Sequence, residues 1–380
     1  MAKKKKESEE TEEVMSDEEE RDKALAELFK AANKNFGAGS LIYAEDDKFK
    51  EIHRIPTGIC PLDYALGGGV PVGRISLFYG HKSTSKTTNI LRLIGNAQKM
   101  CSNCWTDIVV ENDKPSCKCG KVRKTVVAWL DVEAVWDHSW SSRFLTIDDS
   151  LILSHPSSAE ETIDLAHAAL KAHVDIIVID SIAFMTPMSE QEKSSQEHSV
   201  GTQARLMGNA VRKFVSTINE LGKTKGRRPT IILTNQIRMK VGVMYGNPET
   251  TSGGLAAGFA TSVEIKTSAA KYEMDDVSGK PISVENKAKV VKNKTAPAQI
   301  EVEWKVALMK TEIKNVGDVI DEDWVFDMGE KSGLISVAPQ KVECDGQTYR
   351  GRSLLEKHWM DNREAYQRFK DTLMPVLLAI

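Results

Sequence analysis

The chain has 380 residues, of which 41% are hydrophobic, and this is enough for a large folded domain with a buried core. No apolar run reaches the roughly 18 residues of a membrane-spanning helix, and no apolar stretch follows the basic cluster at residues 3–6, so we expect a cytoplasmic protein with no membrane partner. The formal net charge is −3, but residues 1–22 contain 5 basic and 10 acidic side chains, which leaves the rest of the chain at +2. Such a nearly neutral body would bind nucleic acid through local groups and not through a uniformly basic surface.

The N-terminal region begins as a charged tail and continues as a helix. Residues 1–21 are of low complexity, so we expect them to be disordered. A helix is predicted from Asp17 to Phe36, and Gly37 and Gly39 end it. Apolar side chains recur in it at helical spacing, at Leu25, Leu28, Phe29, Ala32 and Phe36. This stripe packs either in the core of its own chain or against a neighbouring subunit.

From about residue 51 the pattern changes to short apolar strands that alternate with helices. Strands are predicted at 75–79, 125–130, 151–154, 175–179 and 230–234, with a helix at 87–100. The alternation predicts an α/β fold with a mostly parallel sheet covered by helices on both faces. Ligands of such sheets bind at the carboxyl ends of the strands.

Composition suggests four segments. Residues 1–21 form the tail and residues 22–50 the N-terminal segment, which contains most of the helix. We expect the core at 51–314 and a small α+β domain at 315–380, which ends in a helix at 362–378.

A loop with the features of a phosphate-binding site lies between the first predicted core strand and the helix after it. Residues 80–87, GHKSTSKT, follow the pattern G-x-x-x-x-G-K-[ST] except at Ser85, where the pattern has glycine. Backbone N–H groups at the helix start would cradle phosphate oxygens, Lys86 would supply a charge and Thr87 would hold magnesium. The loop alone also fits a chance Ser/Thr-rich turn. The nucleotide-binding residues predicted here are Gly80, Ser83, Thr84, Ser85, Lys86, Thr87 and Thr88.

Two further carboxylates end predicted strands. Asp180 closes the apolar run 175–180, the form of a second nucleotide motif whose carboxylate orients magnesium. Glu133 follows the strand at 125–130, and a carboxylate there can accept a proton from an attacking water. A solvated loop acid is the alternative for Glu133.

Four of the six cysteines lie within 19 residues, as the pairs Cys101/Cys104 and Cys117/Cys119. Four thiolates on a hairpin can bind zinc in tetrahedral geometry, and such a small hairpin would take most of its stability from the metal. Reduced thiols without metal are the alternative. The hairpin carries basic side chains that fit contact with DNA, contact with a protein partner or solubility alone, namely Lys114, Lys118, Lys121, Arg123 and Lys124.

Five stretches together resemble the RecA family. They are LFKAANKNFGAGSLI, IPTGICPLDYALGGGVPVGRISLFYG, DSIAFMTP, NQIRMKVGVMYGNPETTSGG and KVVKNKTAP. The resemblance runs from about Asp22 to the C-terminus, interrupted by one insertion at 101–124. It implies a RecA-type ATPase core, an N-terminal polymerisation segment and a small C-terminal domain. It further implies ATP-dependent filaments on single-stranded DNA and strand exchange with double-stranded DNA, with single-strand-binding or mediator proteins as further partners.

The resemblance also assigns roles to residues at matching positions. It implies that Glu133 activates water for attack on the γ-phosphate and that Gln236 senses this phosphate. It implies that Lys292 and Lys294 reach the nucleotide of an adjacent subunit, so that ATP lies between protomers. Asp137 and Trp140 match the adenine-binding positions, although the family usually has tyrosine at the second.

Two segments match the DNA-binding regions of the family. The matching positions in the first are Val200, Gly201, Arg205 and Arg212, and those in the second are Arg238, Met244, Tyr245, Gly253 and Gly254. Glycine-rich helix starts and arginines can hold phosphates, while valine and methionine can wedge between bases. A solvated helix face is the alternative for Arg205 and Arg212.

Three positions depart from the family pattern. Ser85 replaces the loop glycine, Lys82 stands where glutamate is common and Gly258 stands where lysine is frequent at the subunit interface. Such departures are similar to those of phage-encoded members. Two other functions remain open: a paralogue that binds ATP and DNA with little hydrolysis, which Ser85 favours, and a RecA-fold helicase-type motor, which would lack the polymerisation segment.

Overall fold

The structure is a computed structural model that describes residues 17–47, 51–112, 114–191, 201–239, 249–251, 260–311 and 314–379. The chain divides into two compact units. One unit comprises Met1–Glu51 with Glu220–Gly226, and the other comprises Ile52–Asn219 with Arg227–Ile380. No helix in the described part of the chain is long and apolar enough to cross a membrane.

The first unit contains the predicted N-terminal helix. Helix α1 spans Asp17–Phe36, the predicted bounds, and four acidic side chains occupy its first turn, where they complement the helix dipole. The prediction of a disordered tail over residues 1–21 is therefore wrong for residues 17–21, which belong to this helix. A short 3₁₀ turn, η1, follows at Ala44–Asp46, and Phe29 stacks on Tyr43 with ring centroids 4.9 Å apart. Much of the apolar stripe is exposed, since Leu28 and Phe36 are 53% and 77% accessible.

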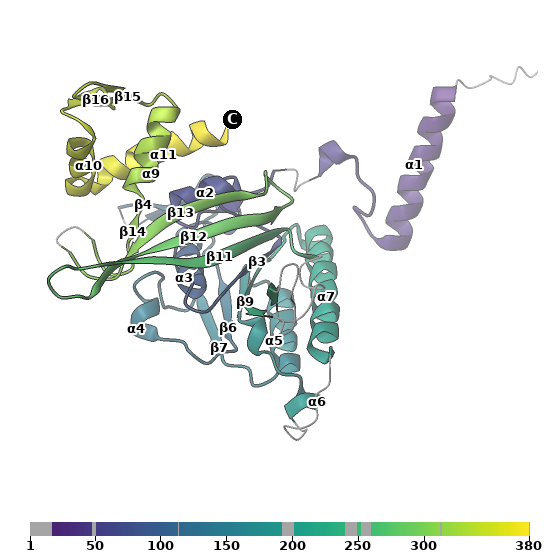
Figure 1. Cartoon of the computed structure of the whole chain (residues 1–380). Coiled ribbons are helices and arrows are strands. Elements are labelled where there is room, and N and C mark those ends of the chain that lie inside the picture. The colour runs from purple at the N-terminus through teal and green to yellow at the C-terminus, as the bar shows by residue number, and fades with distance from the viewer. Residues whose placement is uncertain are drawn as a thin grey trace, which may run out of the picture. The chain divides into compact units, whose positions relative to one another are not determined.

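The second unit is built on a large sheet whose central part is parallel (Figure 1). Its parallel strands are β3 (Ile75–Gly80), β6 (Val127–Asp131), β7 (Leu151–Ser154), β8 (Ile176–Asp180), β9 (Thr230–Met239) and β11 (Val263–Met274). They lie in the order β11-β3-β9-β8-β6-β7, and the five strands predicted for this region are confirmed with shifts of a few residues.

The register brings the strand ends together. Gly80 at the end of β3 pairs with Gln236 of β9, and Asp131 of β6 pairs with Asp180 of β8. The carboxyl ends of four neighbouring strands therefore meet at one edge of the sheet, which is where ligands of open α/β sheets bind.

An antiparallel extension continues the sheet beyond β11. It consists of β12 (Pro281–Asn293), β13 (Ile300–Ala307) and β14 (Val319–Ile320), while β10 (Glu249–Thr251) pairs with β9. Burial alternates along β12, because one face of the strand packs on the core and the other is partly exposed to solvent. The individual strands of this extension were not among the predicted elements.

Helices surround the sheet and bury its apolar faces. They are α2 (Cys60–Leu66), α3 (Lys86–Gln98), α4 (His138–Ser141), α5 (Ala159–Lys171), α6 (Met188–Gln191) and α7 (Thr202–Lys225), with the 3₁₀ turn η2 at Ile182–Phe184 and a small ribbon of β1 (Arg54–Ile55) and β2 (Val70–Pro71). Helix α3 begins one residue before its predicted start and ends before the predicted Met100. Ile90, Leu93 and Ile94 of this helix are fully buried against the sheet.

The C-terminal part, for which an α+β domain was predicted, packs around a second apolar cluster. It contains α9 (Glu322–Lys331), β15 (Ile335–Ala338), β16 (Lys341–Cys344), β17 (Gln347–Tyr349), α10 (Arg352–Asp361) and α11 (Arg363–Leu378). Trp359, Tyr366 and Phe369 form its centre, and Cys60 of α2 joins the same cluster. Asn362 caps α11 by accepting the Ala365 N–H at 3.0 Å.

Candidate nucleotide site and cysteine cluster

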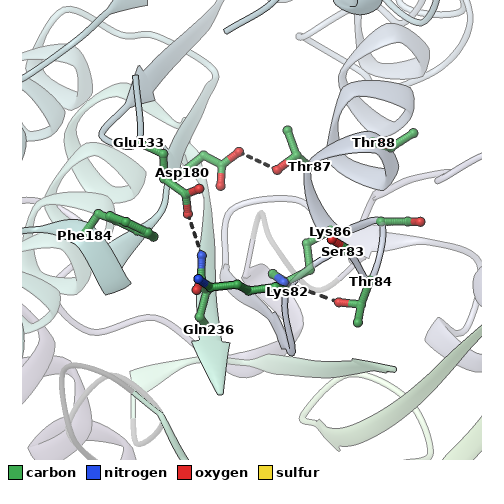
Figure 2. Close-up of a pocket in the computed structure, with 11 residues that line it drawn as sticks. Lys82, Ser83, Thr84, Lys86, Thr87, Thr88, Glu133, Asp180, Phe184 and Gln236 are labelled. Carbon is green, nitrogen blue, oxygen red and sulfur yellow. Dashed lines mark hydrogen bonds between the residues drawn. The ribbon is translucent and has the colours of Figure 1, made fainter. Parts of the chain in front are cut away.

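A polar cavity of about 490 Å³ opens at the sheet edge where the carboxyl strand ends meet (Figure 2). The phosphate-type loop and the start of α3 form one side of it, and β8, β9 and the turn after β6 form the other. Its lining consists of Lys82, Ser83, Thr84, Ser85, Lys86, Thr87, Thr88, Glu133, Asp180, Phe184 and Gln236. The loop residues and carboxylates that the sequence singled out separately thus share one cavity.

The loop that forms this cavity depends on one close approach and two unusual backbone conformations. A Cβ on Gly80 would lie 2.2 Å from the carbonyl oxygen of Thr267, so only glycine fits there. Ser83 and Ser85 both adopt a positive φ of 58°. Ser85 directly precedes α3, and its hydroxyl makes no capping hydrogen bond to the helix. The phosphate-loop pattern has glycine at position 85, and the backbone there takes the left-handed conformation that favours glycine, but this chain has serine.

Lys86 lies folded over its own loop. Its Nζ donates to the carbonyl oxygens of His81 at 2.6 Å and Gly80 at 3.3 Å, and to Thr84 Oγ1 at 3.3 Å. Partial burial lowers the pKa of Lys86, and the nearby carboxylates of Asp180 and Glu133 oppose that change. The ammonium therefore lies at the centre of the loop with only neutral oxygens as direct partners.

Thr87 and Asp180 bring a hydroxyl oxygen and a carboxylate oxygen together across the cavity. The Thr87 hydroxyl donates to Asp180 Oδ2 at 2.8 Å, and Thr234 donates to Asp180 Oδ1 at 2.6 Å. Burial raises the pKa of Asp180, while these two hydrogen bonds act in the opposite direction. A hydroxyl and a carboxylate are hard oxygen ligands, the kind that magnesium prefers.

Glu133 and Gln236 are in direct contact (Figure 2). Gln236 Nε2 donates to Glu133 Oε1 at 3.1 Å, and the Ser181 hydroxyl donates to the same oxygen at 2.7 Å. The second carboxylate oxygen of Glu133 takes part in neither bond. Sequence reasoning did not single out Ser181 or Thr234, although Ser181 follows directly on a predicted strand end, the position at which a polar side chain reaches a ligand site.

The two residues predicted to hold adenine lie outside the cavity lining. Asp137 caps the short helix α4, where Oδ1 accepts the Trp140 N–H at 2.7 Å and the Ser139 hydroxyl at 2.7 Å. Trp140 packs edge-on against Phe144 with ring centroids 5.2 Å apart.

Lys292 and Lys294 also lie outside this lining, at the end of β12. Lys292 forms an ion pair with Glu264 at 3.4 Å, and Lys294 is exposed. Neither lysine is therefore among the residues that line the cavity of its own chain.

The predicted DNA-binding residues lie partly outside the described chain. Val200, Met244, Tyr245, Gly253 and Gly254 fall outside the described residues. Gly201 immediately precedes α7 with a φ of 89°. Arg205 and Arg212 are both exposed on this helix. Arg238 lies in β9, where its backbone pairs with Thr250 of β10.

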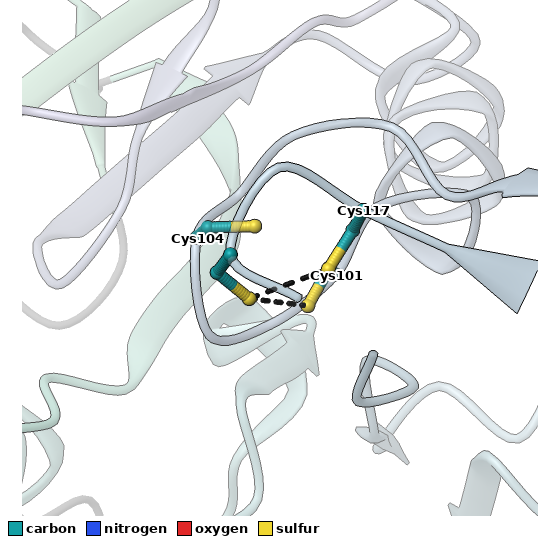
Figure 3. A group of neighbouring side chains, drawn as sticks. Cys101, Cys104 and Cys117 are labelled. Carbon is teal, nitrogen blue, oxygen red and sulfur yellow. Dashed lines mark hydrogen bonds between the residues drawn. The ribbon is translucent and has the colours of Figure 1, made fainter. Parts of the chain in front are cut away.

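The four clustered cysteines converge on one point (Figure 3). Their sulfur atoms all lie within 4.8 Å of one another, with Cys117 and Cys119 Sγ 3.3 Å apart and Cys101 and Cys119 Sγ 3.9 Å apart. They flank an antiparallel hairpin of β4 (Val109–Glu111) and β5 (Lys114–Ser116), as predicted. Four sulfur donors at this spacing suit a tetrahedral zinc ion.

Arg123 links this cluster to the main sheet. Its backbone N–H donates to Cys101 Sγ at 3.4 Å, and its guanidinium forms an ion pair with Asp175 at 3.2 Å. Asp175 directly precedes β8, and its second oxygen accepts the Val126 N–H at 3.0 Å. Burial raises the pKa of Asp175 to about 6. The hairpin is therefore attached at the amino ends of the strands, whereas the polar cavity lies at their carboxyl ends.

Comparison with known proteins places this architecture in a family. A family model described as the RecA N-terminal domain matches residues 23–113 and 116–312. A Protein RecA of Teredinibacter turnerae is 33% identical over 94% of this chain and 94% of its own length, and one of Bacteroides thetaiotaomicron is 36% identical over 82% and 85%. A Protein RecA of Mannheimia haemolytica is 36% identical over 76% and 71%. Because the family model and these relatives match most of the sequence, the chain belongs to the RecA family of recombinases.

Proposed function

We propose that this chain is an ATP-dependent DNA recombinase that forms filaments on single-stranded DNA and catalyses homologous pairing and strand exchange in recombination and repair. The observation that carries the proposal is the single cavity that brings together Lys86, Thr87, Asp180, Glu133 and Gln236. Family membership supports the same activity. The polar lining suits a nucleoside triphosphate, and the oxygen atoms of Thr87 and Asp180 suit the magnesium ion that accompanies it.

In this proposal the residues of the cavity divide the work of ATP hydrolysis. The N–H groups of the loop and Lys86 hold the β- and γ-phosphates. Glu133 accepts a proton from water while the water oxygen bonds to the γ-phosphorus and the bond from that phosphorus to the ADP oxygen breaks. Gln236, held against Glu133 at 3.1 Å, would exchange this contact for one with the γ-phosphate.

Thr87 and Asp180 are the residues that would hold magnesium in this cavity. Bound there, the ion would neutralise charge on the phosphates. The 2.8 Å contact between the two oxygen groups supports the assignment, because both donors already lie within reach of one position.

Assembly would complete the site in this reading. Lys292 and Lys294 would reach the nucleotide of an adjacent protomer, with the adenine beside Asp137 and Trp140. The exposed apolar side chains of α1 support a homo-oligomer, because Leu28 and Phe36 offer surface that a neighbouring copy could bury. We retain residues 22–50 as the polymerisation segment, 51–314 as the ATPase core and 315–380 as the C-terminal domain.

DNA would bind along the two segments predicted from the sequence. The exposed guanidinium groups of Arg205 and Arg212 support phosphate contacts beside the N–H groups at the start of α7. Mediator proteins and a cytoplasmic location stay predictions.

We further propose that Cys101, Cys104, Cys117 and Cys119 bind a structural zinc ion. The convergence of the four sulfur atoms supports this, and so does the small size of the hairpin, which buries little apolar surface of its own: Val109 and Val110 are 51% and 63% exposed.

The test of the proposed function is ATP hydrolysis with and without single-stranded DNA. The unaltered chain should hydrolyse ATP faster when DNA is present and should form filaments visible by electron microscopy with a slowly hydrolysed ATP analogue. Lys86→Ala should reduce hydrolysis by about a hundredfold or more, because it removes a preorganised charge. Lys99→Ala at the exposed end of the same helix is the matched control and should hydrolyse ATP normally.

Two results would change this conclusion. Normal turnover by Lys86→Ala would refute the site assignment. Filaments on DNA without DNA-stimulated turnover would favour the paralogue with little hydrolysis, whose structural basis would be the strained backbone of Ser85.

A further inference from the structure

Lys82 lies in the nucleotide cavity, and neither the phosphate-loop pattern nor the resemblance to the family assigns it a function. It belongs to the loop between β3 and α3, it is exposed, and it lines the cavity together with Lys86. Within the described residues Lys82 forms no hydrogen bond or ion pair, whereas Lys86 donates to three oxygens of the loop. The ammonium of Lys82 is thus available to a ligand.

The two lysines serve different places in the cavity. Lys86 lies over the loop itself, with its Nζ 2.6 Å from the carbonyl oxygen of His81. Figure 2 shows the Lys82 side chain directed into the cavity, toward the side where Gln236 meets Glu133. In the proposed function this side receives the terminal phosphate, because Gln236 and Glu133 act on it.

Neither of the two carboxylates that face the cavity forms an ion pair with Lys82 among the described residues. Asp180 is bonded to the hydroxyls of Thr87 and Thr234, and Glu133 is bonded to Ser181 and Gln236. An additional phosphate would therefore meet a lysine without an anionic partner, and a charged hydrogen bond between them would form without first breaking an ion pair.

We propose that Lys82 binds the γ-phosphate of ATP within its own protomer, so that a single chain distinguishes ATP from ADP before any neighbour contributes a lysine. This inference rests on the proposed function of the cavity. Its consequence is that Lys82 adds a second lysine of the same chain, beside Lys86, at the terminal phosphate, whereas Lys292 and Lys294 could add their charge only after assembly.

The experiment measures equilibrium binding of ADP and of a slowly hydrolysed ATP analogue, with magnesium and without DNA. The full-length chain is used at a concentration at which sedimentation shows single protomers. Lys82→Gln should weaken the ATP analogue by about tenfold, the value for one charged hydrogen bond at an exposed position, and leave ADP unchanged. Lys82→Arg should restore most of the affinity, and Lys82→Glu should weaken the analogue further.

Lys280→Gln is the matched control, since Lys280 is also an exposed lysine but lies in the turn between β11 and β12. It should change neither affinity. The inference on Lys82 fails if Lys82→Gln binds the analogue as the unaltered chain does, or if ADP and the analogue weaken equally. If the unaltered chain binds no ATP at all, the proposed function of the cavity fails instead.

Discussion

At the scale of single residues, Ser85 is the position where sequence and conformation disagree. Its φ of 58° and ψ of 20° lie in the left-handed region, which costs a residue with a Cβ about 1 kcal/mol relative to glycine. The hydroxyl makes no helix-capping bond that would offset this cost. The loop therefore keeps the backbone conformation typical of a glycine while carrying a side chain on the surface that faces the cavity.

Ser85→Gly should accordingly raise the free energy of unfolding by about 1 kcal/mol, because glycine adopts this conformation without strain. Thermal or urea unfolding of the nucleotide-free chain measures the change. Ser216→Gly, in the interior of α7, is the control of opposite sign and should lower stability by about 0.5 kcal/mol. A loss of stability in Ser85→Gly would show that the serine side chain stabilises the loop in some other way.

The carboxyl group of Asp180 is balanced between burial and hydrogen bonds. Burial raises its pKa above the ordinary aspartate range, and the hydroxyls of Thr234 and Thr87 limit the rise. Magnesium needs the ionised form, so its binding should weaken as pH falls through this raised pKa.

Thr234→Val should move that loss of affinity to higher pH, because it removes the 2.6 Å hydrogen bond that favours the carboxylate and leaves a side chain of similar shape. The measurement is the affinity for magnesium and ATP over a pH series. Thr125→Val, in a buried threonine that precedes β6 and donates to the carbonyl oxygen of Met100, should leave the profile in place. A profile that Thr234→Val does not move would mean that another group controls the pH dependence.

At the scale of elements, the cysteine hairpin gains little stability from its own strand pairing and side-chain packing. Its two strands have three residues each, and all six are exposed. Its connection to the sheet runs through Arg123 and Asp175, at the strand ends opposite the nucleotide cavity. Loss of metal should therefore loosen the hairpin first and affect the cavity little.

Cys117→Ser should lower the zinc content from about one ion per chain to a small fraction, since three thiolates with one hydroxyl bind zinc far more weakly than four thiolates. Elemental analysis of freshly purified protein gives the metal content, and hydrogen exchange locates the loss of protection within residues 101–124. Ser116→Ala beside it is the control and should retain the metal. Unaltered protein that contains no zinc would refute the site.

At the scale of the whole molecule, the first unit buries little apolar surface by itself. In α1 only Ala32 is buried, while Leu28, Phe36, Ile42 and Tyr43 of the unit are 48–77% exposed. Exposed apolar surface of this kind is typical of sites of contact between proteins.

Removal of residues 1–51 should leave a folded ATPase core that no longer self-associates. The core clusters of the second unit contain no residue of this segment, which is why they should persist. Light scattering with single-stranded DNA and an ATP analogue measures assembly, and circular dichroism checks folding. Substitution of Leu28 and Phe36 by serine in the full-length chain should weaken assembly in the same direction. Filaments of normal length from the truncated protein would contradict the role given to this segment.

The sequence alone determined the elements whose signal is local. The strands that become β3, β6, β7, β8 and β9 are short apolar runs, and α1 has the predicted bounds because its apolar spacing and the glycines after it are both explicit. The phosphate-type loop, Asp180, Glu133 and the four cysteines could also be selected, because the chemistry of each is visible in a few consecutive residues.

Only the tertiary structure decided which of these residues meet. The contact of Glu133 with Gln236 joins positions 103 residues apart, and that of Thr87 with Asp180 joins positions 93 apart. No local pattern encodes such contacts, because strand order and register create them. The same holds for the long strands β11–β13, whose half-polar sequence becomes sheet through pairing with its neighbours. It also holds for the loop next to Ser85, where the hydroxyl of Thr84 meets that of Thr267 in β11 at 2.8 Å and Ser85 itself has a left-handed backbone.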